Sequence, residues 1–142
     1  MVGQVKHFTD LCVRRMAHQL FVALLRDADS FPAGRRGSIL AEQLLRSAGS
    51  IGANIAEGFS RSRRKFANSL DIALGEANEA ESWLYKARDA GWLTEEAAAE
   101  RLRTVVVLEK MLSSLKAAIA ANDGAVREPE GEYRLEQVDD VS

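Results

Sequence analysis

The sequence predicts an all-α protein: an antiparallel up-down-up-down four-helix bundle over residues 1–121, followed by a mobile acidic tail over residues 122–142. Four long stretches place apolar residues three and four positions apart, which is the periodicity of an amphipathic helix. Short connections separate these stretches, and none of them shows the strict alternation of a half-buried strand. Amphipathic helices joined by short loops favour antiparallel neighbours around one core.

The chain has the length and composition of one helical domain. It has 142 residues, of which 46% are hydrophobic and 28% charged, enough for a sizeable core. No apolar run approaches the roughly 18 residues that span a membrane, and Met1–Asp10 lacks the apolar segment of a signal peptide. Cys12 is the single cysteine, so we expect no internal disulfide, a reducing cytoplasm, and a buried thiol acting as a small apolar group.

The first helix is predicted to begin at Thr9, because a threonine hydroxyl is a good N-cap acceptor. Its apolar positions recur at helical spacing: Val13, Ala17, Leu20 and Leu24. Aromatic, proline and glycine residues then predict a loop: Phe31-Pro32, Gly34 and Gly37. We expect Arg35 and Arg36 to lie in this loop, and Ser38 to cap the second helix.

The second helix is predicted to run to about Phe59. Gly58 is its expected stop, because glycine adopts the left-handed conformation of a helix C-terminus without strain. The apolar face of this helix is Leu40, Leu44, Ala48, Ile51 and Ile55. Small residues also crowd the stretch from Ser47 to Ala56, so we expect another helix to approach it closely.

Recognisable end signals frame the third and fourth helices. Ser62 or a neighbour is expected to begin the third helix, and Gly91 to end it. Its apolar seam alternates spacings of four and three: Phe66, Leu70, Ala73, Ala77, Ala80, Leu84 and Ala87. Thr94 is the predicted cap of the fourth helix, with Glu95 and Glu96 in the first turn. The apolar line of that helix is Val105, Leu108, Leu112, Leu115 and Ile119.

A family signature lies at the end of the second helix: Ser50, Ile51, Gly52, Ala53, Asn54, Ile55, Ala56, Glu57, Gly58 and Phe59. It resembles the SIPxNIAEGF signature of a bacterial four-helix bundle protein family. That family includes the proteins encoded in intervening sequences of large-subunit (23S) ribosomal RNA genes and the accessory protein of diversity-generating retroelements. The resemblance extends from about Phe8 to Lys116. The family usually has proline where this chain has Gly52, so a kink there is permitted rather than imposed.

The resemblance implies more than a fold. It implies a setting that involves RNA or a retroelement, and assembly into a five-fold ring of bundles. Accessory proteins of the resembling family also dock a reverse transcriptase. None of these implications assigns a catalytic role to Ser50, Ile51, Asn54, Ile55, Ala56, Glu57, Gly58 or Phe59, which we interpret as structural.

Charge is distributed unevenly along the chain. Residues 1–65 contain 11 Lys and Arg against 5 Asp and Glu, whereas residues 66–142 contain 8 against 16. The tail, residues 122–142, carries 7 acids and 2 bases. The net charge of −2 therefore understates how basic the folded part is. The tail is either a solvated, solubilising segment or a competitor that covers the basic surface.

The basic residues of the first half are the candidate nucleic-acid-binding residues: Arg35, Arg36, Arg46, Arg61, Arg63, Arg64 and Lys65. Together with the resemblance, they predict a non-enzymatic nucleic-acid-binding protein that favours structured RNA. Binding would be mainly to phosphates, and therefore steeply salt-dependent. The loops before and after the second helix lie at opposite ends of an antiparallel bundle, so one contiguous patch is not guaranteed.

Two other interpretations of the same basic residues remain open. Cations beside a helix are often simply solvated. They would also suit a protein-interaction scaffold that docks an acidic partner or a reverse transcriptase, as the resembling accessory protein does. A neighbouring reverse-transcriptase gene with a template repeat would favour the scaffold.

The sequence offers no convincing catalytic or metal site. A di-metal bundle enzyme needs Glu-x-x-His pairs on two helices, but neither of the two histidines, His7 and His18, follows a glutamate by three. Asn54 and Glu57 have no activated nucleophile or base beside them, so we expect them to satisfy backbone groups or pair with a nearby arginine. We therefore expect no enzyme activity, no metal and no cofactor.

Several helices carry apolar residues beyond the line that their own core needs: Phe21, Leu25, Ile72, Leu74, Trp83, Tyr85, Val107 and Met111. Surplus apolar surface tends to mark a subunit contact, which predicts a homo-oligomer. The count of five comes from the resemblance alone. A closed ring would repeat the basic loops around one axis.

Overall fold

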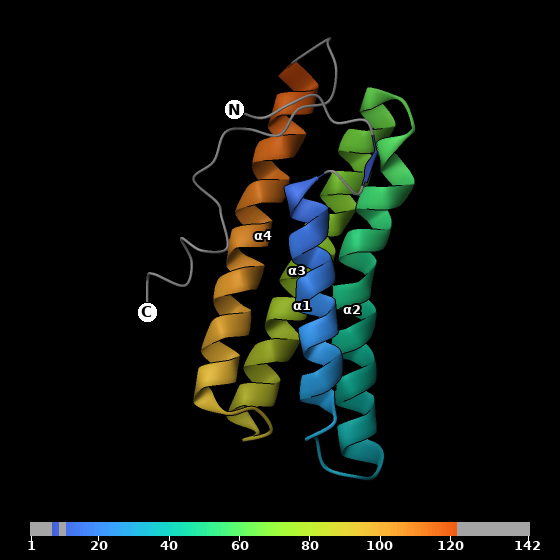
Figure 1. Cartoon of the computed structure of the whole chain (residues 1–142). Helices are drawn as coiled ribbons and strands as arrows, with labels where there is room; N and C mark the ends of the chain where they lie inside the picture. Colours follow the sequence, from blue (N-terminus) through green and yellow to red (C-terminus); the bar gives the residue numbers. More distant parts are fainter. Residues whose placement is uncertain (1–6, 9–10, 122–142) are drawn as a thin grey trace.

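The computed structural model describes residues 7–8 and 11–121 of the chain. Four helices follow one another in it: α1 (Cys12–Ala28), α2 (Arg35–Phe59), α3 (Arg63–Asp89) and α4 (Glu95–Ala121). Each runs antiparallel to its predecessor, and α4 closes the bundle against α1 (Figure 1). No strand occurs among the described residues, so the predicted all-α four-helix bundle is confirmed. The predicted acidic tail lies outside the described residues and stays a prediction.

The core is formed by the four apolar lines that the periodicity predicts. Every member of these lines is buried, including the whole α3 seam from Phe66 to Ala87. Four of the seven seam residues are alanines with no exposed surface: Ala73, Ala77, Ala80 and Ala87. Their short side chains let α2 and α4 approach α3 closely, which places α3 between its two neighbours. None of the described helices has an apolar stretch sufficient to cross a membrane.

Three predicted helix ends are confirmed in atomic detail. The Ser62 hydroxyl accepts a hydrogen bond from the Lys65 backbone N–H (3.3 Å), and the Thr94 hydroxyl accepts one from the Ala97 N–H (3.1 Å). Gly91 follows the end of α3 with a φ of 78°, a conformation that favours glycine. The two hydroxyls satisfy backbone N–H groups that have no partner within their helix. The Gly91 conformation turns the chain away from the axis of α3.

The predicted starts of α1 and α2 are wrong. α1 begins at Cys12, after Leu11, whereas Thr9 lies outside the described residues. α2 begins at Arg35, after Gly34 with a φ of 104°, and not at Ser38. Arg35 and Arg36 therefore belong to the first turn of a helix and not to a loop.

Gly37 explains why α2 starts early. A Cβ at this position would lie 1.9 Å from the Pro32 carbonyl oxygen, so only glycine lets the incoming chain cross the first helical turn. Sequence analysis treated Gly37 as a helix breaker. It is instead a buried contact point inside the helix.

Gly58 also has a different role from the one predicted. Among the described residues, only Gly34 and Gly91 have a positive φ, so Gly58 is not a left-handed stop. It lies within α2, buried, where a Cβ would be 2.4 Å from the Cβ of Ser69 on α3. Gly58 thus permits α2 and α3 to meet closely just before the turn that connects them.

A half-buried ion pair fastens α1 to α4 at the lower end of the bundle in Figure 1. Arg101 donates from Nε to Asp27 Oδ2 (2.7 Å) and from Nη2 to Oδ1 (3.2 Å). These hydrogen bonds raise the pKa of Arg101 above its usual value and outweigh the opposing effect of burial. The two-pronged geometry fixes orientation as well as charge.

Cys12 and the surplus apolar residues differ in part from expectation. Cys12 is exposed, not buried, and Arg15 Nη2 donates to its sulfur at 3.0 Å. Five of the eight surplus residues pack partly against the core: Phe21, Leu74, Trp83, Val107 and Met111. The other three have exposed side chains: Leu25 with a relative exposure of 44%, Ile72 with 55% and Tyr85 with 40%. Ile39, on α2, is exposed as well, at 48%. Some apolar surface therefore remains on the outside of the bundle.

The close α2–α3 contact predicts opposite effects of alanine at two helical glycines. Gly58→Ala forces its new methyl group against Ser69 and should lower the free energy of unfolding by about 1–3 kcal/mol. Gly75→Ala is the matched control, because it meets no atom within 4 Å; it should raise stability by about 0.5–1 kcal/mol through helix propensity. Urea midpoints at constant m-value measure both. Equal stabilisation by the two variants would contradict the contact.

Candidate nucleic-acid interface

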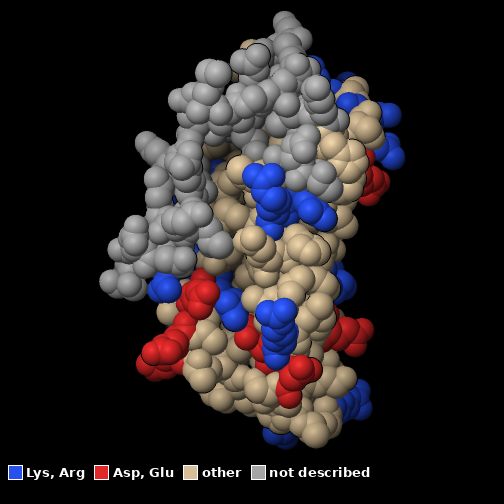
Figure 2. Space-filling view, viewed as in Figure 1, with Lys and Arg blue, Asp and Glu red and all other residues tan. Residues whose placement is uncertain are grey.

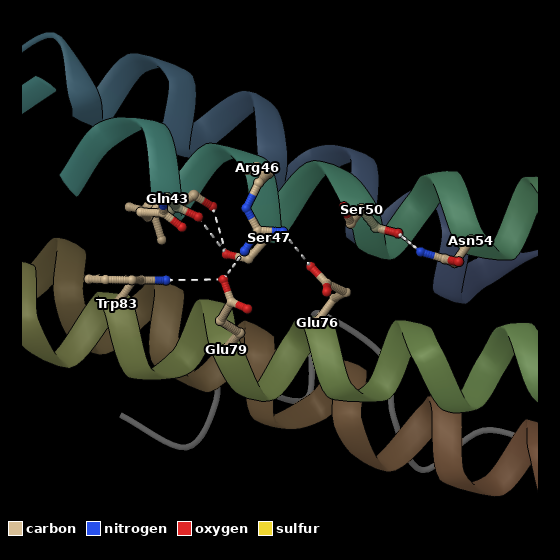
Figure 3. Close-up of polar contacts among 9 residues, drawn as sticks. Gln43, Arg46, Ser47, Ser50, Asn54, Glu76, Glu79 and Trp83 are labelled. Carbon is tan, nitrogen blue, oxygen red and sulfur yellow. Dashed lines mark hydrogen bonds and ion pairs between the residues drawn. The ribbon is translucent and has the colours of Figure 1, made fainter. Parts of the chain in front are cut away.

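The signature residues of α2 make contacts within the bundle. Ile51 and Ile55 are fully buried, and Asn54 Nδ2 donates to the Ser50 carbonyl one turn earlier at 2.8 Å (Figure 3). Glu57 is exposed and pairs with Arg61 at 3.8 Å. The expected pairing of polar signature residues with backbone groups and a nearby arginine is therefore present.

The basic run after α2 divides into a structural cation and an exposed group. Arg63, at the first position of α3, donates to the Ile119 carbonyl in the last turn of α4. That carbonyl is among those a helix leaves without an internal partner, so Arg63 holds the end of α4 against the start of α3. Arg64 and Lys65 are exposed. No carboxylate within the described part of the chain pairs with either side chain.

The antiparallel topology brings two further arginines to the same end. α1 begins where α2 ends, so Arg14 and Arg15 in the first turn of α1 share the upper end in Figure 1 with Arg61–Lys65. Two carboxylates of this region are already engaged, Glu57 by Arg61 and Asp71 by Lys116 (2.7 Å). We call this region the basic end: Arg14, Arg15, Arg61, Arg64 and Lys65.

The other three predicted cations lie elsewhere. Arg35 and Arg36 are exposed at the start of α2, separated from the basic end by the 25-residue length of this helix, about 37 Å. Figure 2 shows Lys and Arg spread along the visible face instead of gathered in one patch. The seven candidates thus do not form one contiguous surface within a subunit.

Arg46 is taken up by contacts between helices. Its guanidinium pairs with Glu76 (3.4 Å) and with Glu79, both on α3, and the Trp83 indole N–H donates to Glu79 at 3.2 Å (Figure 3). Two carboxylates already offset its charge. Arg46 therefore stabilises the α2–α3 pair and is poorly placed to bind a phosphate.

A groove of about 340 Å³ lies between α1 and α2 beside the basic end: its lining is Phe8, Arg14, Ala17, His18, Phe21, Ala48, Gly49, Gly52, Ala53 and Ala56. Sequence analysis assigned the small residues of α2 to tight helix packing. Ser47 and Ala48 meet that expectation, since both are buried, and so does Gly49, whose Cβ would lie 3.2 Å from the Phe21 ring. Further along α2, the same small side chains leave open space, a consequence that their spacing alone does not reveal.

Carboxylates do not gather into a metal site in the described residues. No group of three or more His, Cys, Asp or Glu side chains there is placed to hold a metal ion. Instead, Glu109 of α4 lies against Glu81 of α3. Burial, followed by a hydrogen bond to Glu81 and the charge of Glu81, raises the pKa of Glu109 to about 8. Burial and the neighbouring Glu81 therefore favour the protonated form of Glu109 below about pH 8.

A sequence model of the 23S rRNA-intervening sequence protein family matches residues 9–114. The chain belongs to this family. It is also similar to the crystal structure of a protein of unknown function from the S23 ribosomal protein family of Bacteroides thetaiotaomicron, with 31% identity and a TM-score of 0.67. That similarity covers 73% of this chain and 97% of the other. No curated protein sequence matches the chain. The family resemblance carried by Ser50–Phe59 is thereby confirmed.

In this member of the 23S rRNA-intervening sequence protein family, the contact between Glu109 and Glu81 predicts that stability depends on pH. Because folding raises the pKa of Glu109 to about 8, the native state holds a proton that the unfolded chain releases near pH 4.5. The stabilisation is complete below that pH and is lost as pH rises through 8. Glu109→Gln should flatten this decline and stabilise the protein by about 1 kcal/mol at pH 9, given solvent screening of a half-buried group.

Urea denaturation between pH 5 and 9 measures the effect. The exposed Glu42→Gln serves as the control and should leave the pH dependence of stability unchanged. A Glu109→Gln variant with the same decline as the parent protein would contradict the assignment.

Proposed function

We propose that this protein is a non-enzymatic, cytoplasmic, oligomeric nucleic-acid-binding bundle that contacts the phosphates of structured RNA through the basic end. The observation that carries the proposal is the pair of exposed cations, Arg64 and Lys65, which no described carboxylate neutralises. Arg61, Arg14 and Arg15 lie at the same end. Several cations presented together are the electrostatic footprint of phosphate binding.

The family to which the chain belongs favours RNA over DNA as the ligand, whereas the charges do not distinguish the two. Phosphate contacts position a nucleic acid without reading its sequence. The family name connects its members with 23S rRNA intervening sequences, which supports a structured RNA as the natural ligand. Arginines also suit this task, because the planar guanidinium can donate two hydrogen bonds to one phosphate.

Assembly of several subunits would bring several copies of the basic end together. We propose a homo-oligomer, and five subunits as the count that the family resemblance implies. Exposed Ile39 and Ile72 support self-association, because solvent-exposed apolar groups of this size gain free energy when a second copy covers them. A ring would bring one basic end per subunit to bear on the same RNA, and linked weak contacts bind far more tightly than single ones.

Charge substitutions at the two ends of α2 test the location of binding. Arg64→Gln with Lys65→Gln should weaken RNA binding at low salt by about tenfold and lower the slope of log K against log salt by about 1.5, as expected for two lost phosphate contacts. Arg35→Gln with Arg36→Gln is the matched control: it removes the same charge at the other end and should change binding little.

Fluorescence anisotropy with a structured RNA and with duplex DNA, from 20 to about 200 mM salt, reads out both variants over the range in which phosphate contacts weaken. Absence of binding by the parent protein at the lowest salt would overturn the proposed function. Equal loss in the two double variants would overturn its location. Retained affinity for an acidic protein such as a reverse transcriptase, without RNA binding, would favour the scaffold interpretation.

Light scattering tests the assembly. The subunit mass is 15.6 kDa, so a pentamer should give about five times that mass. The value should persist at about 0.5 M salt, because apolar contacts are not screened as charge contacts are. A monomeric mass would contradict the oligomer, and a dimeric or tetrameric mass would contradict the count of five.

A further inference from the structure

The groove between α1 and α2 combines an apolar floor with a rim that carries the Arg14 cation. Ala17, Ala48 and Ala53 contribute methyl groups to the lining, while Arg14 and His18 stand in the same wall. The groove opens at the surface, since His18 and Ala53 are exposed. Its volume of about 340 Å³ falls at the lower end of the range of binding pockets. Such a groove fits a segment with a few apolar side chains flanked by acids.

The chain leaves the described structure at the end of the bundle toward which this groove lies. α4 ends at Ala121, and the hydrogen bond from Arg63 to the Ile119 carbonyl ties this terminus to the start of α3. The end of α4 and the start of α1 both lie at the upper end of the bundle. Residues 122–142 therefore depart from the same end that carries the exposed cations.

The sequence of the tail matches the chemistry of the groove. Tyr133, Leu135 and Val138 are apolar, and acids stand before, between and after them: Glu132, Glu136, Asp139 and Asp140. Arg134 is the one base of the segment, which keeps a net negative charge. The twelve steps from Ala121 to Tyr133 span up to about 40 Å when extended. That exceeds the width of a bundle whose helix axes lie about 10 Å apart. The segment can therefore reach the groove of its own subunit.

We propose that residues 132–140 dock in the α1–α2 groove of the same chain, with their acids facing Arg14 and the neighbouring cations of the basic end. Tyr133, Leu135 and Val138 occupy the apolar floor. The docked segment competes with nucleic acid for the same charges, and this part of the proposal rests on the proposed function. Docking itself does not depend on it.

Hydrogen exchange on the full chain tests docking without any nucleic acid. Leu135→Ser with Val138→Ser should release the segment, so amides of 12–21 and 49–57 exchange several-fold faster than in the parent protein. Amides at the lower end of α2 should be unaffected. Ala125→Ser with Val126→Ser is the matched control, because it changes two apolar residues of the tail outside the proposed docking segment. Unchanged exchange in the first variant overturns docking.

A substitution on the groove side gives an independent check. Ala53→Leu places a larger side chain at an exposed helical position that lines the groove, so it should fill the floor without disturbing the core. It should accelerate exchange of residues 12–21 as the tail variant does, and combining the two changes should add nothing further. If the two changes accelerate exchange additively, the tail segment and Ala53 do not share one contact, and docking in the groove is overturned. An effect that grows with protein concentration assigns the groove to the tail of a second copy and overturns docking within one chain.

Competition is measured separately as RNA affinity at low salt. A site covered for half to nine-tenths of the time raises the apparent Kd between about two- and tenfold, so the tail variant should bind more tightly by that factor. Faster exchange with unchanged affinity overturns competition. Faster exchange in a protein that binds no RNA in any variant overturns the proposed function, while docking stands.

Discussion

The close approach of α2 and α3 is the constraint on which the rest of the bundle depends. Gly58 lies where any side chain would collide with Ser69, and the α3 seam presents alanines with no exposed surface. Two helices held this close need only a short turn between them, from Ser60 to Ser62. That turn places the basic run at one end of the bundle, and the α3 register aligns Glu76 and Glu79 with Arg46.

The cations of this protein illustrate how position divides one residue type between two tasks. Arg101 and Arg63 join helices, the first through a half-buried carboxylate and the second through a backbone carbonyl of α4. Their charge is satisfied inside the protein. Arg64 and Lys65, in contrast, do not join helices: they are exposed, and their charge faces solvent or a ligand. A count of basic residues cannot separate these tasks, whereas partners and burial can.

The fold was predictable from the sequence to a greater extent than the site. Apolar periodicity fixed every core line, and side-chain chemistry identified Ser62, Gly91 and Thr94, because these signals are local. Gly37 and Gly58 were misinterpreted because a glycine can end a helix or admit a close neighbour, and only the positions of Pro32 and Ser69 decide between them. The pairing of Arg46 depends on carboxylates thirty and more residues away, which single-sequence reasoning cannot place. The groove depends likewise on two helices at once.

Topology converts the uneven charge of the sequence into uneven charge in space. In an up-down-up-down bundle, the start of the first helix, the turn between the second and third, and the end of the fourth share one end. Two of these three segments contribute exposed cations, and the third leads into the 21-residue acidic segment. The acidic segment is therefore tethered to the same end of the bundle as the basic residues, within a distance that its length can span. Under the docking proposed above, an anionic ligand at this end would compete with a tethered segment of the same sign of charge.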